Sequence, residues 1–560
     1  MNSAAPAPSP SPASAGRAWF YGGVALVALK LWLVAGHTVL AVGFAEYDDM
    51  LFLRLAHHLL RGEWLGPYSQ LTLAKGPMYS LFIAGVFLTG VPLFFAQHVL
   101  YAVSAATLGR ALRPLVPRAG ARFAIFAVVL FNPVTYDAII HTRVLRQQIL
   151  HSEVLLVLSA LVALYARRDL PVRRLLPWSI LLGASLSAFT LTREEWIWLM
   201  PAVIPLWAAA LFPLWRKRPA DGRVRLAAIL ALPAALWAAG PLLVAVLNDR
   251  FYGVFTTCEF NQRDFKDAMG ALMRPRPEHP LPFVPVTREV RMKLYPLCPT
   301  LALLRGELDG PTGETWAGIT ESLTGLPPDR GEIGGGWFMW ALRRAVDDTG
   351  HVHSGAEAAA FYRRIADEVN TACDTGKLDA GPRRSGFLPP LNGENLGRYP
   401  RALWNAIHML TTFDAMDAWP QSAGAGSPEE LELIRDLTRD RYNIPRPPEH
   451  QRWLDNLRVN WLEQILVTYR RIVPITSVLG LGLAVAAVVT AITRRRWTFF
   501  GLLAAGLTGS CLAICGIVAL IDATSFPALN AGYFTGTYAL WILLTFVGPL
   551  AFLELRSAPA

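Results

Sequence analysis

The stretch "WFYGGVALVALKLWLVAGHTVLAVGFAEYDDMLFLRLAHH", residues 19–58, holds the pattern that decides the fold. Its first part, residues 19–42, is apolar and has about the 20 residues that a helix needs to cross a bilayer. It is longer than the apolar region of a signal peptide and has no clear small-residue cleavage site, so we expect a retained span. Three carboxylates, Glu46, Asp48 and Asp49, follow where this span ends.

The composition of the whole chain extends this prediction. Of the 560 residues, 53% are hydrophobic and 17% are charged, against roughly 25% charged residues in soluble domains. The mean hydropathy is +0.34. We therefore predict an all-α polytopic membrane protein. The net charge of +10 comes mostly from Lys and Arg in short clusters beside apolar runs, where such residues orient spans, so we expect no nucleic-acid partner.

Further apolar runs predict about ten to twelve transmembrane helices. These runs are residues 77–112 (broken near Gly90), 123–136, 149–166, 175–192, 196–214, 226–247, 472–492, 499–520 and 533–553. Basic loops lie at residues 113–122, 166–174, 216–225 and 494–496. If the N-terminus is cytoplasmic and the run 77–112 crosses the membrane once, all four basic loops lie on the cytoplasmic side.

The predicted organisation has four parts. Residues 1–18, rich in Pro, Ala and Ser, read as a disordered cytoplasmic tail. Residues 19–247 form a membrane module whose first outer loop is 43–75. Residues 248–471 form a mainly helical extracytoplasmic domain, large enough for its own core, and 472–560 are C-terminal membrane helices. Inside the outer domain, "GWFMWALRRAVDD" and a segment running from a Ser354 cap to a Gly376 stop read as helices.

The first outer loop carries two candidate elements. In "DDMLFLRLAHHLLRGEW" the apolar residues Leu51, Leu55 and Leu59 recur every four positions, which predicts an interfacial helix with this stripe toward lipid. The carboxylates before it could simply suit the positive end of the helix dipole. In "LAKGPMYSLFIAG", Lys75 precedes a Gly-Pro turn; it either anchors the span by snorkelling or binds an anionic headgroup.

Two further charged clusters flank later spans. In "HTRVLRQQILHSEVLLVL", Arg143 and Arg146 lie in an outer loop against the usual bias of Arg toward the cytoplasm. Glu153 enters the next span, where an ionisable group is costly; an Arg–Glu structural pair is the alternative. In "LTREEW", Arg193 and Glu194 begin a charged turn between two closely spaced spans, which could also be an ordinary polar turn.

The order of these motifs over residues 19–247 resembles the membrane glycosyltransferases of the GT-C fold. The nearest families are the polyprenyl-phosphate-sugar enzymes related to protein O-mannosyltransferases and aminoarabinose transferases. The resemblance implies that an acidic pair in the first outer loop carries catalysis, here Asp48 and Asp49, where the family more often has Asp followed by Glu. It also implies that Lys75 contacts the lipid phosphate, although the family has Lys-Pro and this chain has Lys-Gly-Pro.

This resemblance predicts a hexosyl- or pentosyltransferase in a bacterial inner membrane. The enzyme would move a sugar from a polyprenyl-phosphate donor to a cell-envelope acceptor on the outer face, beside the membrane lipids. Asp48 would take the acceptor proton, and Asp49 would orient Asp48 or the acceptor. Cations would stabilise the leaving phosphate. The candidate cations are Lys75, Arg143, Arg146 and Arg193, and the supporting carboxylates are Glu46, Glu153 and Glu194. The acceptor cannot be carried over from the family.

Other functions remain open at this stage. A transporter or lipid flippase should show matched halves and polar groups at mid-depth, which the sequence lacks. A non-catalytic envelope scaffold would explain each motif separately but not their order. We expect no essential metal, although adjacent aspartates can hold a divalent cation, and His351 and His353 lack a zinc-site pattern. Cys258, Cys298 and Cys373 leave room for one disulfide.

Overall fold

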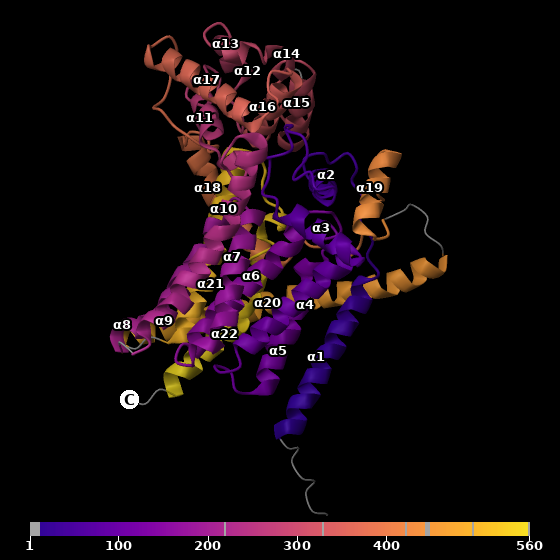
Figure 1. Ribbon diagram of the computed structural model, residues 1–560, viewed down its shortest axis with the longest axis vertical. Coiled ribbons are helices and arrows are strands. Elements are labelled where there is room, and N and C mark those ends of the chain that lie inside the picture. Colours follow the sequence, from indigo (N-terminus) through magenta and orange to yellow (C-terminus); the bar gives the residue numbers. More distant parts are fainter. Residues whose placement is uncertain are drawn as a thin grey trace, which may run out of the picture.

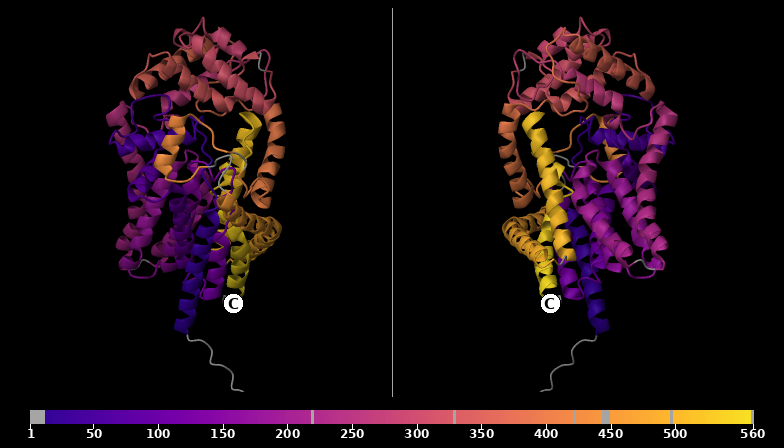
Figure 2. Two further views of the ribbon diagram at one scale, coloured as in Figure 1. Left: turned by 90° about the vertical axis from the view of Figure 1, so that its right-hand side faces the viewer. Right: turned by 90° about the vertical axis from the view of Figure 1, so that its left-hand side faces the viewer.

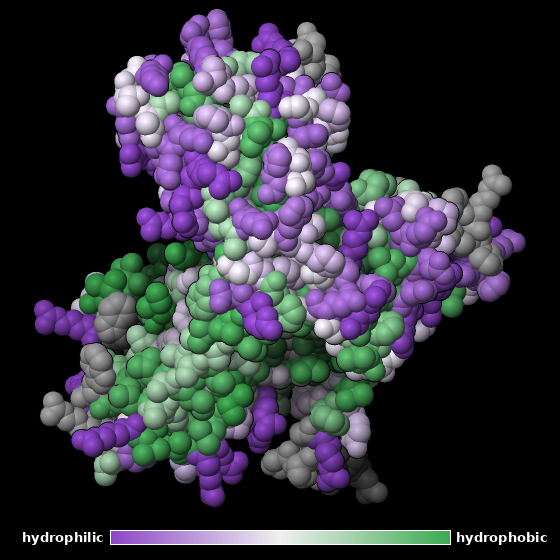
Figure 3. Space-filling model, turned by 45° about the horizontal axis from the view of Figure 1, so that its top comes forward, coloured by the Kyte–Doolittle hydropathy of each residue, from purple (hydrophilic) through white to green (hydrophobic). Residues whose placement is uncertain are grey.

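The computed structural model describes residues 12–217, 220–327, 330–420, 423–442, 449–495 and 498–557. Within these residues all regular elements are helical, and β-structure is limited to isolated bridges. A bundle of long helices carries a compact cap of short helices at one end, and the C-terminus lies at the other end (Figures 1 and 2). Figure 3 shows hydrophobic side chains over the bundle and mostly hydrophilic ones over the cap. The chain is therefore an all-α polytopic membrane protein, as predicted.

The apolar helices fall into three groups within the described residues. Those long enough to span a membrane are Arg17–Val34, Gln147–Arg167, Gly222–Tyr252, Glu449–Thr493, Phe499–Thr524 and Tyr538–Arg556. Shorter apolar helices are Ala119–Leu130, Leu176–Thr192 and Trp196–Phe212. The third group is a bent pair, α3 (Met78–Thr89) and α4 (Leu93–Ala111), which meet at 106°. The exact number of crossings stays a prediction.

The bundle is built around α6 (Gln147–Arg167), which packs against α4, α7 (Leu176–Thr192) and α8 (Met200–Lys217). Helix α6 is buried on nearly every face. A helix that is apolar all round belongs in such a position. The remaining bundle helices are α1 (Pro12–Val34), α5 (Ala119–Leu130), α9 (Gly222–Leu226), α10 (Leu232–Tyr252), α20 (Glu449–Thr493), α21 (Phe499–Thr524) and α22 (Tyr538–Ser557).

The break between α3 and α4 lies at Gly90, as the sequence predicted. Gly90 ends α3 in the left-handed region, with φ +77°. This conformation is free of steric penalty only for glycine. The sharp bend is compatible with a broken span or with a re-entrant loop, so the single net crossing of residues 77–112 stays a prediction.

The cap forms the main part of the outer domain. Its helices are α11 (Arg263–Leu272), α12 (Arg288–Leu294), α13 (Pro299–Ala302), α14 (Arg305–Leu308), α15 (Pro311–Thr324), α16 (Gly335–Asp348) and α17 (Gly355–Asp374). They enclose a separate hydrophobic core that includes Phe265, Phe338 and Phe361. Helices α16 and α17 confirm two sequence predictions. The Ser354 hydroxyl accepts a hydrogen bond from the Glu357 amide at 3.2 Å and so caps α17.

The rest of the outer region returns toward the bundle. Helix α18 (Gly393–Thr412) descends from the cap and packs against α21 (Figure 1). Helix α19 (Pro428–Thr438) packs against α2 (Asp49–Leu60) and α3. The first turns of α20 project sideways from the bundle below α19 (Figure 1). Because α20 is one continuous helix, the predicted boundary between residues 471 and 472 falls inside it.

Three sequence predictions differ from the structure. Residues 12–18, predicted as part of a disordered tail, begin helix α1, where Pro12 is tolerated in the first turn; residues 1–11 lie outside the described residues. The stripe on α2 does not face lipid, because Leu51 and Leu55 are buried in a core that includes Ile434 and Leu437 of α19. Finally, all five cysteines carry free thiols, so no disulfide forms among Cys258, Cys298 and Cys373.

Candidate active site at the membrane surface

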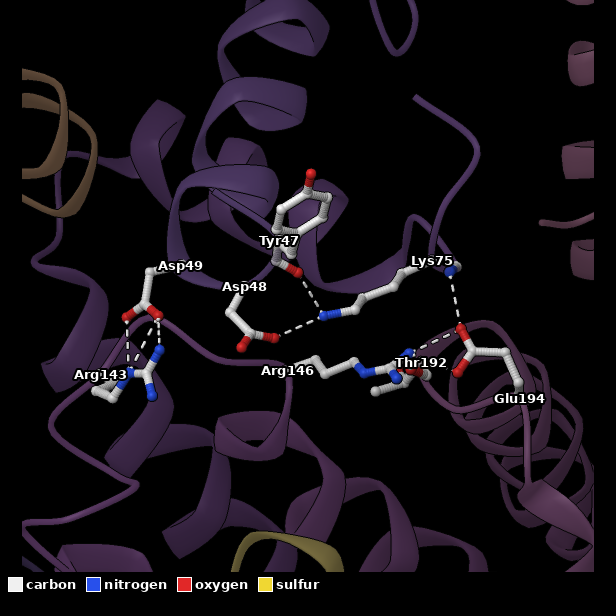
Figure 4. Close-up of polar contacts among 9 residues, drawn as sticks. Tyr47, Asp48, Asp49, Lys75, Arg143, Arg146, Thr192 and Glu194 are labelled. Carbon is white, nitrogen blue, oxygen red and sulfur yellow. Dashed lines mark hydrogen bonds and ion pairs between the residues drawn. The ribbon is translucent and has the colours of Figure 1, made fainter. Parts of the chain in front are cut away.

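A cavity of about 1180 Å³ lies where the membrane helices meet the outer domain. We call it the main cavity. Its wall comes mainly from the first outer loop, the charged segments that precede α6 and follow α7, helices α15 and α16, and residues 521–533. Its side chains include Asp48, Lys75, Arg146 and Glu194, drawn in Figure 4. Charged motifs that are up to 150 residues apart therefore meet in one place, as the sequence predicted.

Asp48 presents its carboxylate to this cavity. It occupies the N-cap position of α2, yet its side chain makes no capping hydrogen bond, so the capping interpretation does not hold for Asp48. Its Oδ1 instead accepts a hydrogen bond from Lys75 Nζ at 2.7 Å (Figure 4), and its side chain is 51% exposed. The positive charge of Lys75 holds the pKa of Asp48 below its ordinary value, outweighing the effect of burial. Asp48 is therefore a carboxylate at neutral pH.

Lys75 is buried rather than snorkelling. Its Nζ donates a second hydrogen bond to the carbonyl oxygen of Tyr47 at 2.7 Å. It also lies 5.3 Å from the ring centroid of Phe52 and 5.4 Å from that of Trp340, within the range of cation–π attraction. Burial lowers the pKa of Lys75, and Asp48 offsets part of this effect. Lys75 therefore does not anchor the span by snorkelling, and its ammonium group is held in the wall of the main cavity.

Only glycine fits at position 76, between Lys75 and Pro77. A Cβ atom at Gly76 would lie 2.0 Å from the carbonyl oxygen of Leu191, near the end of α7. The amide of Gly76 donates to Glu194 Oε1 at 3.2 Å. The Lys-Gly-Pro sequence therefore lets the turn press against the end of α7, where it fixes the position of Lys75.

Arg146 and Glu194 form a second ion pair in the cavity wall. Arg146 Nη1 donates to both carboxylate oxygens of Glu194 at 2.8 Å and to the Thr192 carbonyl oxygen at 2.9 Å (Figure 4). Burial alone would raise the pKa of Glu194, but the charge and hydrogen bonds of Arg146 hold it below its ordinary value. Both groups are therefore charged, and Arg146 keeps its other guanidinium nitrogens for a further anion.

Asp49 differs from its neighbour Asp48. It is buried, does not line the main cavity, and accepts hydrogen bonds from Arg143 and from the Val144 amide, the latter at 3.0 Å. Burial works to lower the pKa of Arg143, but Asp49 outweighs it and raises that pKa. Arg143 itself lines the cavity. Asp49 therefore fixes the segment that carries Arg143 and does not meet a molecule in the cavity.

The remaining predicted residues lie at the edges of the site. Arg193 lines the cavity, pairs with Glu195, and has its guanidinium 5.6 Å from the ring centroid of Tyr533. Glu46 also lines the cavity and pairs with arginines of α2 and the outer domain. Glu153 is buried and does not line the main cavity. Its Oε1 accepts a hydrogen bond from the Thr192 hydroxyl at 2.8 Å. Glu153 thus supports the end of α7 rather than pairing with an arginine.

The sequence analysis missed the aromatic wall of the cavity. Trp316 of α15 and Trp337 and Trp340 of α16 line it from the outer domain. The ring of Tyr47 packs on Trp316 and Trp340, with centroids 5.0 and 5.2 Å apart. The motif "GWFMWALRRAVDD" contained a signal, because its two tryptophans, three positions apart, share one face of a helix.

Among the described residues, no group of three or more His, Cys, Asp or Glu side chains is placed to hold a metal ion. His351 and His353 are exposed in the segment before α17. The need for a metal stays a question for experiment.

Comparison with known proteins gave two kinds of result. No family model matches the chain, and no curated protein matches it. Among solved structures, the crystal structure of ArnT from Cupriavidus metallidurans in the apo state is similar at 15% identity and a TM-score of 0.30, over 96% of this chain and 78% of that one. The crystal structure of the same protein bound to undecaprenyl phosphate matches at 14% identity and a TM-score of 0.31, over 94% and 77%.

Proposed function

We propose that this protein is an integral membrane glycosyltransferase that moves a sugar from a polyprenyl-phosphate donor to a cell-envelope acceptor. One observation carries the proposal: a carboxylate with an open side, Asp48, lies beside a row of cations in a single cavity at the end of the membrane helices. A donor of this kind brings an anionic phosphate and an activated sugar to that depth. Its transfer needs a base and a cationic clamp.

Asp48 acts as the general base in this proposal. Its Oδ1 is bound to Lys75, and no described residue donates a hydrogen bond to its Oδ2. The acceptor hydroxyl gives its proton to Oδ2 while its oxygen forms a bond to the anomeric carbon. The bond between that carbon and the phosphate oxygen breaks, and its electron pair leaves on the polyprenyl phosphate.

Lys75 and Arg146 form the centre of the clamp. Each is held by a carboxylate, Asp48 or Glu194, within the cavity wall. A phosphate that binds Lys75 takes over part of the charge that keeps the pKa of Asp48 low. The pKa of Asp48 then rises, so donor binding makes Asp48 a stronger base. Arg143 and Arg193 extend the cationic wall on either side, with Asp49 and Glu195 as their positioning partners.

The proposed orientation places the site on the outer face of a bacterial inner membrane. The C-terminal end and helix α9, which contains Arg223 and Arg225, lie at the end of the bundle away from the outer domain (Figure 1). Arginine is enriched on the cytoplasmic side of membrane proteins. This arrangement supports a cytoplasmic N-terminus, with the cap outside the cell membrane.

The test compares envelope lipids, glycans and glycoproteins by mass spectrometry in cells with and without the gene. We expect one envelope component to lack a sugar without the gene. The wild-type gene should restore it, and Asp48→Asn should lower transfer roughly a thousandfold, the usual scale of a lost general base. Asp379→Asn is the matched control, because Asp379 lies in an exposed ion pair of the outer domain.

Full restoration by Asp48→Asn would remove the basis of the proposal. Movement of lipid across proteoliposomes by the purified protein, with no sugar transfer, would favour a flippase instead. An unchanged envelope, together with no binding of polyprenyl phosphate, would favour a non-catalytic scaffold.

A further inference from the structure

A second cavity lies on the other side of the first outer loop. It has a volume of about 340 Å³, and we call it the side cavity. Its wall is formed by α2, by residues 65–72 of the same loop and by the end of α16. Pockets of about 300 Å³ and more are the usual size for small-molecule sites. The proposed donor does not account for this cavity, because the cationic clamp lies entirely in the main cavity.

Three side chains separate the two cavities, and we call them the partition. They are Glu46, Arg344 and Asp348, which line both cavities. Arg344 Nε donates to Asp348 Oδ2 at 2.8 Å, and Arg344 Nη1 donates to Glu46 Oε2 at 3.3 Å. Their side chains are between 28% and 37% exposed. Ion pairs with this exposure contribute little net stability, so the partition can open without disturbing the fold.

The chemistry of the side cavity fits a sugar ring. Leu51, Leu55 and Leu65 supply an apolar surface, while Ser69 and Gln70 supply polar groups. The charged residues of its wall are of both signs, namely Glu46, Asp347 and Asp348 against Arg54 and Arg344. A sugar has apolar C–H faces and a rim of hydroxyls that both donate and accept, so a wall that mixes apolar groups, hydrogen-bond donors and hydrogen-bond acceptors can bind it.

One polar side chain in the wall of the side cavity is incompletely paired. Gln70 is 6% exposed and lines the side cavity, and its Oε1 has no hydrogen-bond partner among the described residues. Buried polar atoms are normally hydrogen-bonded. A ligand hydroxyl would satisfy this acceptor once the Gln70 side chain turns toward the side cavity.

We infer that the side cavity binds the sugar unit of the acceptor, whose hydroxyl passes the Glu46–Arg344 partition to reach Asp48. The inference rests on the proposed function and names its acceptor class as a carbohydrate, not a protein side chain. Glu46 lies two residues before Asp48 in the same loop. The acceptor thus approaches Asp48 from a different side than the donor, whose phosphate lies against Lys75 and Arg146.

The experiment uses the full-length protein in lipid nanodiscs with two probes. Methyl glycosides of common hexoses and hexosamines are tested by saturation-transfer NMR, and undecaprenyl phosphate is tested by native mass spectrometry. We expect at least one glycoside to bind, and its signal to fall at least fivefold in Gln70→Leu and Arg344→Ala. Binding of undecaprenyl phosphate should stay within twofold of wild type in Gln70→Leu, which also shows that this variant is folded.

Arg54→Ala is a second variant, because Arg54 is half-exposed on α2 and lines the side cavity alone. The matched control is Arg363→Ala, which breaks an arginine–aspartate pair of the outer domain remote from both cavities. It should leave glycoside binding unchanged.

The outcomes separate the inference from the proposed function. Equal glycoside signals in wild type, Gln70→Leu, Arg344→Ala and Arg54→Ala would overturn the inference, and so would the absence of glycoside binding to wild type. A serine- or threonine-containing peptide that binds wild type but not these variants would also overturn it, in favour of a protein acceptor. If wild type binds glycosides but not undecaprenyl phosphate, the proposed donor fails while the side cavity stands as a sugar site.

Discussion

The two walls of the main cavity differ in chemistry and in origin. The wall from the membrane module consists of cations held by carboxylates on short loops, with Lys75 and Arg146 at its centre. The opposite wall comes from helices α15 and α16 of the outer domain and is aromatic. The walls meet at Tyr47, whose carbonyl oxygen accepts a hydrogen bond from Lys75 while its ring packs on Trp316 and Trp340. In the proposed reaction, the charged wall would stabilise the leaving phosphate, and the aromatic wall would contact the sugar.

The adjacent residues Asp48 and Asp49 have opposite environments. Substitutions at the two positions should therefore differ in their effect on the free energy of unfolding. Asp49→Asn leaves the Arg143 guanidinium without its buried partner, and such a loss typically costs about 3 kcal/mol of unfolding free energy. Asp48→Asn should cost less stability, since half of the Asp48 side chain is exposed and Lys75 Nζ keeps its hydrogen bond to the Tyr47 carbonyl oxygen. Denaturant unfolding of both variants, monitored by tryptophan fluorescence, measures the difference.

The control for Asp49 is Asp379→Asn, which removes one partner of an exposed pair with Arg276. Its effect should stay below about 1 kcal/mol. Equal stability of the two aspartate variants in the first outer loop would show that Asp49 does not fix the Arg143 segment.

Removing the central cation tests the clamp. Lys75→Met should weaken binding of undecaprenyl phosphate by about 30-fold, or about 2 kcal/mol, the scale of a hydrogen bond to a charged group. Without the charge of Lys75, the pKa of Asp48 should rise. Any remaining transfer should therefore lose activity at a higher pH than wild type as the solution is acidified.

Lipid titration by native mass spectrometry and a pH profile of transfer check both effects. Lys293→Met is the control, because Lys293 forms exposed ion pairs in the outer domain. Wild-type affinity in Lys75→Met would place the phosphate elsewhere in the cavity.

The aromatic wall should contribute to catalysis more than to donor affinity. Trp340→Ala removes a ring that contacts both Tyr47 and the ammonium of Lys75. We expect kcat/KM for transfer to fall about 30-fold, since the aromatic and cation–π contacts each contribute about 1 kcal/mol. Trp404→Ala, at an exposed tryptophan of α18, should leave kcat/KM unchanged. A loss confined to donor binding would assign Trp340 to the clamp instead.

The contrast between the walls also explains what sequence reasoning could reach. Charged residues beside apolar runs break a strong local pattern, so Asp48, Lys75, Arg146 and Glu194 could be predicted as candidates. The aromatic wall depends on how a domain with no recognisable family folds onto the membrane module. Tryptophans are common in helix cores, so Trp340 carried no comparable signal.

Local geometry set a second limit on what could be predicted from the sequence. Asp48 and Asp49 are identical in type and adjacent, and only the direction of the chain at the start of α2 decides which one faces the cavity. Leu51 and Leu55 have the periodicity of a lipid-facing stripe. They are buried because α19, nearly 400 residues later, covers them, and no periodicity within α2 contains that information.

The smallest predicted effect lies outside the cavity, where α19 leads toward α20. The Asp440 carboxylate accepts a hydrogen bond from the Phe94 amide at 2.9 Å, at the start of α4. Burial raises its pKa to about 7, with the amide hydrogen bond opposing the shift. This folded-state pKa exceeds the unfolded value, so the folded protein holds the extra proton between about pH 4 and 7. Stability should therefore increase by about 1 kcal/mol as the pH falls from 8 to 6.

Thermal unfolding at several pH values measures this increase, and Asp440→Asn should flatten it because asparagine does not titrate. Asp137 is another buried carboxyl whose pKa is raised, to about 6, so a smaller slope should remain near that pH in the variant. Asp436→Asn, at an exposed position of α19, should keep the full wild-type slope. An unchanged slope in Asp440→Asn would mean that the carboxyl at the start of α4 is ionised across this range.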